Sequence, residues 1–368
     1  MFRNRRWASL IALFLPLALV AAACGDDDTA SGDTDSQGDN GSGISGTLDG
    51  AGASSQGAAM DGWRAGFQTA NDGVTVNYDP IGSGGGREQF LTGATVFAGS
   101  DGLMDEDEFA QSQERCASDR GAIHLPHYIS PIAVAFNLDG VDELNMSPDT
   151  IAGIFTDEIT NWNDKAIAAD NPDVDLPDMA INPVHRSDES GTTENFTEYL
   201  GAAAGDVWTD GPVEVWPYGG EGAQGTSGVV AAIEAGEGSI GYADASQVTS
   251  LGAVAVGVGD EFVPFSPEAA AKIVDVSERL DGYSEFDFQF ELERDTTESG
   301  VYPIVLVSYH IVCLDYADQA TADLVKAFMT YVGSADGQAA AAAEAGNAPI
   351  SEDLAGQLEA AIDAIGVV

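Results

Sequence analysis

Residues 180–197, AINPVHRSDESGTTENFT, combine a β-rich run, a turn of small hydroxyl residues and the start of a helical pattern. We predict a strand over Ala180–Val184 and a helix that begins at Ser190-Gly191-Thr192-Thr193. The first N–H groups of a helix have no partner inside it, and the helix dipole is positive there. A strand that leads through such a turn into a helix therefore predicts an α/β fold with an anion-binding helix start.

Two other segments repeat this arrangement. Gly50–Ser55 precedes a helical pattern around Trp63, and Ile81–Gly86 lies between a predicted strand, Val74–Tyr78, and a helix over Arg87–Leu91. A single turn of this kind is usually only a helix cap, but three in one chain favour an anion site. No Gly-x-x-x-x-Gly-Lys-Ser/Thr motif occurs, so nucleotide hydrolysis of the P-loop type is not expected.

The rest of the chain also alternates strand and helix patterns, which indicates a mixed α/β architecture. Helix starts with proline at the first position are predicted at Ser147-Pro148 and Ser266-Pro267, and the tail over 319–365 is helical with breaks near Gly333 and Gly346. Further predicted strands are Ile132–Phe136, Ser239–Tyr242 and Val305–Val312.

Asp101 ends a short apolar run, Phe97–Gly102, just before an acidic helical pattern. The structural interpretation is that Asp101 caps a helix over Asp105–Cys116, which is a common use of aspartate.

The composition excludes some classes of partner. The chain carries 61 acidic residues against 13 lysines and arginines, a formal net charge of −48. Binding to nucleic acid or to an anionic membrane surface through a basic patch is therefore not expected.

The N-terminus has the pattern of an export signal. Residues 1–23 combine arginines, a short apolar run and three alanines, and Cys24 follows directly. We interpret this as a lipoprotein signal with Cys24 acylated, for example by palmitate; an ordinary signal peptide is the alternative. Residues 24–43 are small, polar and acidic, which predicts a disordered tether. In an oxidising compartment Cys116 and Cys313 favour one disulfide, although two buried free thiols remain open.

Taken in order, these segments resemble the phosphate-binding proteins of ABC phosphate importers, in the type II periplasmic-binding-protein family. The resemblance spans nearly all of the exported chain, and the run Arg-x-Asp-x-Ser-Gly-Thr is specific. The matching segments are Gly50–Ser54, Tyr78–Ser83, Ala98–Asp101 and Arg186–Thr192, with further matches at Ile154-Phe155, Trp162–Asp164, Trp216-Pro217, Ile240–Tyr242 and Tyr302–Ile304.

The resemblance implies a two-domain "Venus flytrap" fold, with a central, mostly parallel sheet in each domain and hinge closure on the ligand. Domain I is expected over 44–131 and 299–368, and domain II over 132–298. The implied function is high-affinity extracytoplasmic binding of inorganic phosphate and its delivery to the permease subunits of an importer. We expect a monomer with no cofactor and no metal, held at the outer face of the cell membrane by its lipid.

The resemblance also implies which residues bind phosphate. At the positions that match the family's ligands, this sequence has residues of the three turns and Asp101. Asp188 would hold the Arg186 guanidinium in place. Ser54-Ser55 stands where the family usually has Thr-Phe, and backbone N–H groups would do most of the binding there. The implied ligands are Ser54, Ser55, Ser83, Asp101, Arg186, Ser190, Gly191 and Thr192.

Asp101 is the feature that separates the alternatives. An ionised carboxylate only accepts hydrogen bonds, so it suits phosphate, which keeps a proton near neutral pH, and repels sulfate. A protein for another oxyanion, such as sulfate or molybdate, is the nearest alternative. A phosphate-ester hydrolase is less favoured, because His185 has no evident orienting partner. His124 and His127 lack a third metal ligand, so a metal site is not expected.

Overall fold

The computed structural model describes residues 43–368, and these form a mixed α/β fold around one 11-stranded sheet. The main path of the sheet runs β2-β1-β3-β13-β4-β8-β6-β7. Outside this path, β9 pairs with β4, β5 and β10. The predicted signal at 1–23, Cys24 and the tether at 24–43, apart from its last residue, lie outside the described residues. Within the described part of the chain, no helix is both long enough and apolar enough to span a bilayer.

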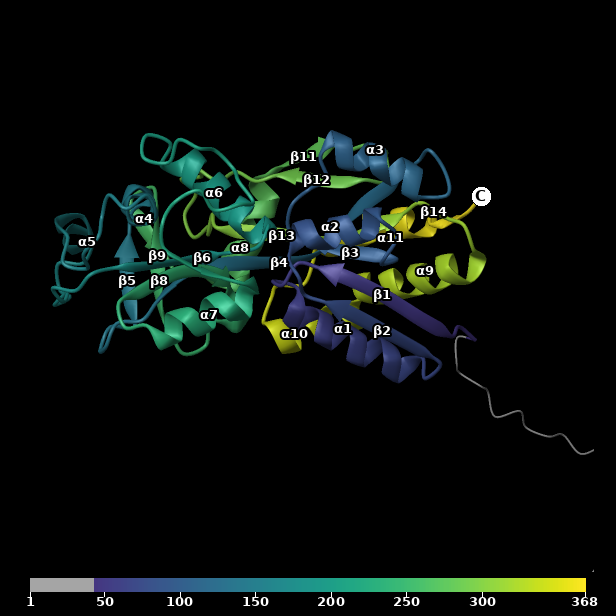
Figure 1. The fold of residues 1–368 in the computed structure, drawn as a ribbon, viewed down its shortest axis with the longest axis horizontal. Coiled ribbons are helices and arrows are strands. Elements are labelled where there is room, and N and C mark those ends of the chain that lie inside the picture. The colour runs from purple at the N-terminus through teal and green to yellow at the C-terminus, as the bar shows by residue number, and fades with distance from the viewer. Residues whose placement is uncertain (1–42) are drawn as a thin grey trace, which may run out of the picture. The chain divides into compact units, whose positions relative to one another are not determined.

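Figure 1 shows how the helices and strands are arranged. The strands of the large sheet are β1 Gly46–Gly52, β2 Val74–Asp79, β3 Phe97–Ser100, β4 Ala122–Phe136, β5 Glu143–Met146, β6 Asn182–Arg186, β7 Glu221–Ala223, β8 Ser239–Asp244, β9 Gly252–Val258, β10 Glu261–Val263 and β13 Val305–Cys313. Two small sheets add β11 Glu278–Asp281, β12 Phe288–Glu291, β14 Asp315–Tyr316 and β15 Gly366–Val367. The helices are α1 Gly57–Ala70, α2 Ser83–Leu91, α3 Glu106–Arg115, α4 Pro148–Phe155, α5 Lys165–Asp170, α6 Gly191–Ala203, α7 Gly225–Ala235, α8 Pro267–Val276, α9 Gln319–Gly333, α10 Ala335–Ala345 and α11 Glu352–Asp363, with a 3-10 turn at Ala245–Gln247.

The long strand β4 joins the two halves of the sheet. Residues 122–131 pair with β13, whereas Ile132–Phe136 pair with β8, both antiparallel. The sheet is mixed, not mostly parallel, because this antiparallel β13-β4-β8 core links two parallel groups, β2-β1-β3 and β8-β6-β7. We call the β2-β1-β3-β13 side the first half and the β8-β6-β7 side the second half.

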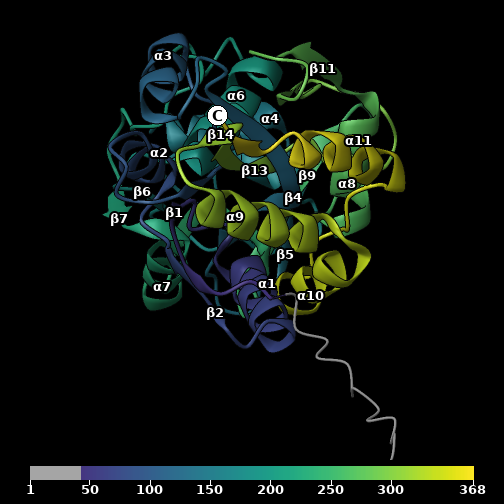
Figure 2. The same cartoon turned by 90° about the vertical axis from the view of Figure 1, so that its right-hand side faces the viewer.

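Helices cover both halves and bury two hydrophobic clusters, a large one that extends through both halves and a small one under α7. In the first half α1, α9 and α10 lie beside one another, with α9 facing the viewer in Figure 2. Trp63 of α1 is fully buried there, and its ring meets that of His310 at 5.2 Å. In the second half α7 packs on β6 and β8.

Most predicted elements are present, with changed boundaries. The strand predicted over Ala180–Val184 lies two residues later, and Ile132–Phe136 is only the end of the 15-residue β4. The helix starts predicted at Ser147-Pro148 and Ser266-Pro267 are confirmed, and each serine caps its helix.

One prediction about the first half is wrong, and the alternative role considered for Asp101 is not seen. Gly50–Gly52 is not part of a turn but the end of β1; a Cβ on Gly50 would collide with the Phe97 ring, so close strand packing explains its glycine. Asp101 does not cap α3 either. Asp105 does so, in a capping box with Glu108, and this leaves the Asp101 side chain available for other contacts.

Candidate functional site

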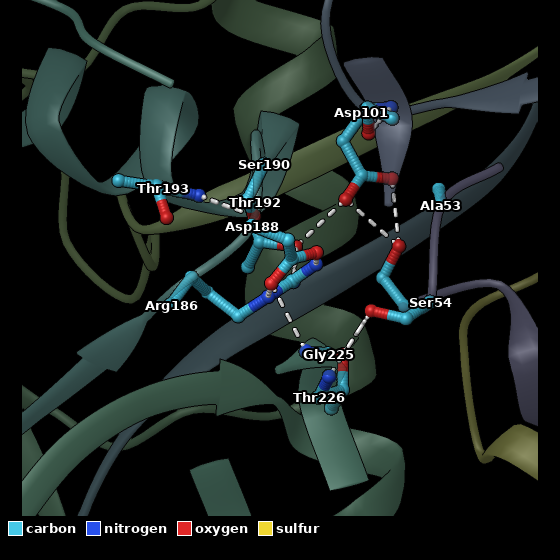
Figure 3. A network of polar contacts seen from close by, with 12 residues as sticks. Ala53, Ser54, Asp101, Arg186, Asp188, Ser190, Thr192, Thr193, Gly225 and Thr226 are labelled. Atoms are coloured by element: carbon cyan, nitrogen blue, oxygen red, sulfur yellow. Dashed lines mark hydrogen bonds and ion pairs between the residues drawn. The ribbon is translucent and has the colours of Figure 1, made fainter. Parts of the chain in front are cut away.

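The predicted turns come together where the two halves meet. Ser54 and Ser55 follow β1, and Asp101 follows its parallel neighbour β3, so both lie at the same edge of the sheet. From the second half, β6 ends at Arg186 and leads to α6, which Ser190 caps. Figure 3 shows Asp101 and Ser54 on one side and Arg186 and Thr192 on the other.

Asp101 is the centre of a network of hydroxyl groups. The Ser55 hydroxyl donates to both carboxylate oxygens, at 2.7 and 2.8 Å, and the Thr192 hydroxyl donates to Oδ2 at 2.8 Å. Ser308 of β13 is the third hydroxyl in the network and donates to Oδ1. Burial raises the pKa of Asp101, while the hydrogen bonds from Ser308, Ser55 and Thr192 act in the opposite direction. The carboxylate thus accepts hydrogen bonds from both halves of the protein.

Ser83 and Gly191 bring the backbone of the two halves close to Asp101. The Asp101 N–H donates to the Ser83 hydroxyl at 3.1 Å, at the start of α2. A Cβ on Gly191 would lie 2.6 Å from the Gly102 nitrogen and 2.8 Å from Ser83 Oγ, so only glycine fits there. The start of α6, with its N–H groups free of intrahelical partners, therefore lies directly against Asp101.

Asp188 holds Arg186 as the sequence predicted. Arg186 Nε donates to Asp188 Oδ1 at 2.8 Å, and its Nη2 forms a second bond to Oδ2. The Gly225 N–H donates to the same carboxylate at 3.0 Å. Although burial acts to raise the pKa of Asp188, its bonds to Arg186 keep it below the usual value. With its Nε–Nη2 edge held by Asp188, the guanidinium directs Nη1 toward Thr192 Oγ1, 3.4 Å away.

Thr226 and Ser308 belong to the network but were missed in the sequence. Ser54 Oγ accepts from the Thr226 N–H at 3.0 Å and shares a hydrogen bond with its hydroxyl at 3.1 Å. Thr226 lies in the first turn of α7, after Gly225 with φ +67°, so this is a fourth helix start at the site. The strand–glycine–hydroxyl pattern used for the other turns would have found it. Ser308 is the one serine of β13, and no local pattern in the sequence marked it as part of the site.

This arrangement can bind an oxyanion that carries a proton. Helix starts, hydroxyls and one guanidinium provide donors, while the single carboxylate provides an acceptor.

The histidines take up other contacts. His185 stacks on Trp216, and its Nδ1 lies 2.9 Å from the Arg186 carbonyl. His124 pairs with Asp287 at 2.8 Å, and His127 with His310 at 3.2 Å. In residues 43–368 no group of three or more His, Cys, Asp or Glu side chains could hold a metal ion.

Cys116 and Cys313 form a disulfide in the structure, with 5.5 Å between their Cα atoms. It ties the end of α3 to the end of β13, and both cysteines are buried.

The sheet topology and the polar network between its halves are those of binding proteins that enclose a small solute between two lobes. The model of the PBP superfamily domain matches residues 37–336. Phosphate-binding protein PstS 3 of Mycobacterium tuberculosis (strain ATCC 25618 / H37Rv) is 37% identical over 376 residues, covering 98% of this chain and 99% of that protein. PstS 2 of the same strain is 33% identical over 375 residues, with the same coverage.

Solved structures agree on the fold. A high-affinity periplasmic phosphate-binding protein (PfluDING), bound with phosphate, matches with a TM-score of 0.66 at 21% identity, over 86% of this chain and 93% of that one. A phosphate-binding protein from Stenotrophomonas maltophilia also gives a TM-score of 0.66, at 19% identity and the same coverage. The chain belongs to the PBP superfamily and, within it, to the PstS family; its fold is the type II fold of that superfamily.

Proposed function

We propose that this protein binds inorganic phosphate between the two halves of its sheet and delivers it to an ABC importer. The observation that carries the proposal is the position of the Asp101 carboxylate. It lies beside Arg186 and accepts hydrogen bonds from hydroxyl groups of both halves. The names of the PstS relatives and the phosphate bound in the PfluDING structure support the same ligand.

Phosphate would take its place among the groups that now contact one another. Arg186, steadied by Asp188, donates to its oxygens, and the starts of α1, α2 and α6 add backbone N–H groups and hydroxyls. Asp101 accepts a hydrogen bond from the P–OH group that phosphate keeps near neutral pH. The proposed ligands are Ser54, Ser55, Ser83, Asp101, Arg186, Ser190, Gly191 and Thr192.

The two halves would act as the lobes of a hinged trap. We assign one lobe to 44–131 and 299–368 and the other to 132–298. The change of partner along β4, from β13 to β8 at Ile132, supports the first of these boundaries. Residues Ile132 and Pro131 would then lie at a hinge.

The protein acts outside the cytoplasm as a monomeric binding protein, and not as an enzyme. The relatives are named as binding proteins, and the histidines nearest the site are held in other contacts, which disfavours the hydrolase alternative. We further propose that Cys24 carries a lipid that holds the protein at the outer face of the membrane, where it meets the permease subunits.

Calorimetry of the full-length protein in detergent, with phosphate, sulfate and molybdate, tests the function. We expect phosphate to bind in preference to the other two anions. Selective binding of sulfate or molybdate would replace phosphate with another oxyanion, and the absence of binding by all three would refute the proposal.

A further inference from the structure

Outside the phosphate site, Arg87 of α2 forms an ion pair that joins the two halves. Its Nη1 and Nη2 donate to Glu214 Oε1 and Oε2 at 2.9 and 2.7 Å, a bidentate pair across the halves. Its Nε donates to Glu108 at 2.9 Å, and Nη1 also reaches Ser100 Oγ at 3.1 Å, next to Asp101. The Arg87 side chain is 6% exposed and that of Glu214 15%, so solvent screens this pair less than a surface pair.

Glu194 of α6 brings a further negative charge to the same place. A Cβ on Gly102 would collide with the Glu194 carboxylate, and it would lie 3.1 Å from Glu214 Oε1 and 3.4 Å from Arg87 Nη1. We call Arg87, Glu108, Glu194 and Glu214 the Arg87 cluster. It holds three carboxylates against one guanidinium, beside the residue that follows Asp101.

We propose that the Arg87 cluster is a proton-linked clamp that stabilises the closed form, so that acidity outside the cell strengthens phosphate binding. This proposal rests on the proposed function. Arg87 and Glu214 belong to opposite lobes, so opening must break their contact, whereas Arg87 and Glu108 belong to the same lobe and stay together.

Glu194 is the group that would take up the proton. Burial, and next the charge of Glu214, raise the pKa of Glu194 to about 7 from an ordinary 4.5. Opening would expose Glu194 to solvent and so remove the burial that is the largest cause of its raised pKa, while Glu214 stays beside it on the same lobe. Closure would then bind protons below about pH 7, because burial keeps Glu194 protonated in the closed form at a pH where the solvated open form is charged.

The other charged groups around Glu194 do not remove this effect. Arg87 and Arg294 act to lower its pKa, while Glu214 and Glu198 raise it. Arg294 is itself bonded to Glu198 at 2.8 Å and to Asn195, so its charge is already compensated. Glu108, and Glu189 beside Gly84, add further negative charge around Arg87. The cluster therefore has more negative charge than its arginine can neutralise.

The test compares the full-length protein with Glu194→Gln, which keeps the shape and removes the titration. Phosphate affinity is measured by calorimetry from about pH 5 to about pH 8, in two buffers of different ionisation enthalpy. The ionisation of phosphate affects both proteins equally. The difference between their pH profiles of phosphate affinity therefore reports the titration of Glu194. The control is Glu237→Gln, an exposed residue on the second half.

Below about pH 7 we expect the dissociation constant for phosphate to rise more steeply with pH in the wild type than in Glu194→Gln. The additional rise should be up to tenfold for each pH unit. The wild type should also take up more protons on binding near pH 6 than Glu194→Gln does, by up to one. Parallel pH profiles would overturn the proton link.

A second variant tests the clamp itself. Glu214→Gln should weaken phosphate binding about tenfold or more, while phosphate stays preferred over sulfate. Unchanged affinity would overturn the clamp. If the wild type binds no phosphate at any pH, the proposed function fails instead.

Discussion

The Thr192 hydroxyl donates to Asp101 Oδ2 at 2.8 Å, although 91 residues separate the two in sequence. Thr192 lies in the first turn of α6 in the second half, and Asp101 directly follows β3 in the first half. A contact of this kind can form only when the two halves are close. Asp101 is proposed to recognise the protonated oxygen of the ligand. Its hydrogen bond to Thr192 would therefore also stabilise the closed arrangement of the two halves.

Replacement Asp101→Asn should relax the rejection of sulfate. The amide introduced there can donate as well as accept, so it no longer repels an oxyanion without a proton. We expect phosphate affinity to fall and the preference for phosphate over sulfate to narrow by about tenfold or more, as measured by competition calorimetry. Asp105→Asn is the control, because it removes the same charge from the residue that caps α3; asparagine keeps the cap, so phosphate selectivity should not change. Unchanged selectivity in Asp101→Asn would remove Asp101 from this role.

Replacement Asp188→Asn should weaken phosphate binding without preventing folding. The charged pair that fixes the Arg186 guanidinium is lost, and hydrogen bonds to charged groups contribute about 1.5–3 kcal/mol each. The dissociation constant should rise by about 10- to 100-fold in calorimetry. Asp206→Asn, at an exposed position after α6, removes the same charge as a control. Equal effects of the two variants would mean that net charge, and not the orientation of Arg186, is what matters.

The sequence predicted the fold well because the signals were local. A strand, a turn of small residues and a capped helix lie within about 15 residues of one another in this fold, and Ser147, Ser190 and Ser266 cap the helices predicted there. The strand β1 was missed because its glycines look like a turn in sequence. They are required instead by close strand packing against Phe97 and Gly99, which only the folded structure reveals.

The contacts between distant segments could not be predicted in the same way. Ser54 and Thr226 are 172 residues apart, and Asp101 and Ser308 are 207 apart, so no local pattern links them. The pairing of Arg87 with Glu214 is equally remote, at 127 residues. In a chain with 61 acidic residues, nothing in the sequence singles out one glutamate as the partner of that arginine.

Replacing both Cys116 and Cys313 by serine should lower stability but leave phosphate binding intact. The disulfide closes a loop across a sequence separation of 197 residues, and removal of a native disulfide costs about 2–5 kcal/mol. Thermal unfolding should show a lower midpoint for the double variant, and reductant should lower the wild-type midpoint toward it. Because the bridge joins α3 to β13 and touches none of the proposed ligands, a large loss of phosphate affinity would contradict this assignment.

Added salt should raise the rate at which phosphate associates. The net charge of −48 repels an anion at long range, and salt screens this repulsion beyond about 10 Å at 0.1 M. Stopped-flow measurements at fixed pH should show a modest increase in rate with sodium chloride, and no increase with sucrose at matched viscosity. Glu189 is exposed and lies across from Gly84, beside the proposed site, so Glu189→Gln should raise the rate at low salt and reduce its dependence on salt. A marked fall in the association rate with salt would mean that the donors of the site, led by Arg186, steer phosphate more strongly than the acidic surface repels it.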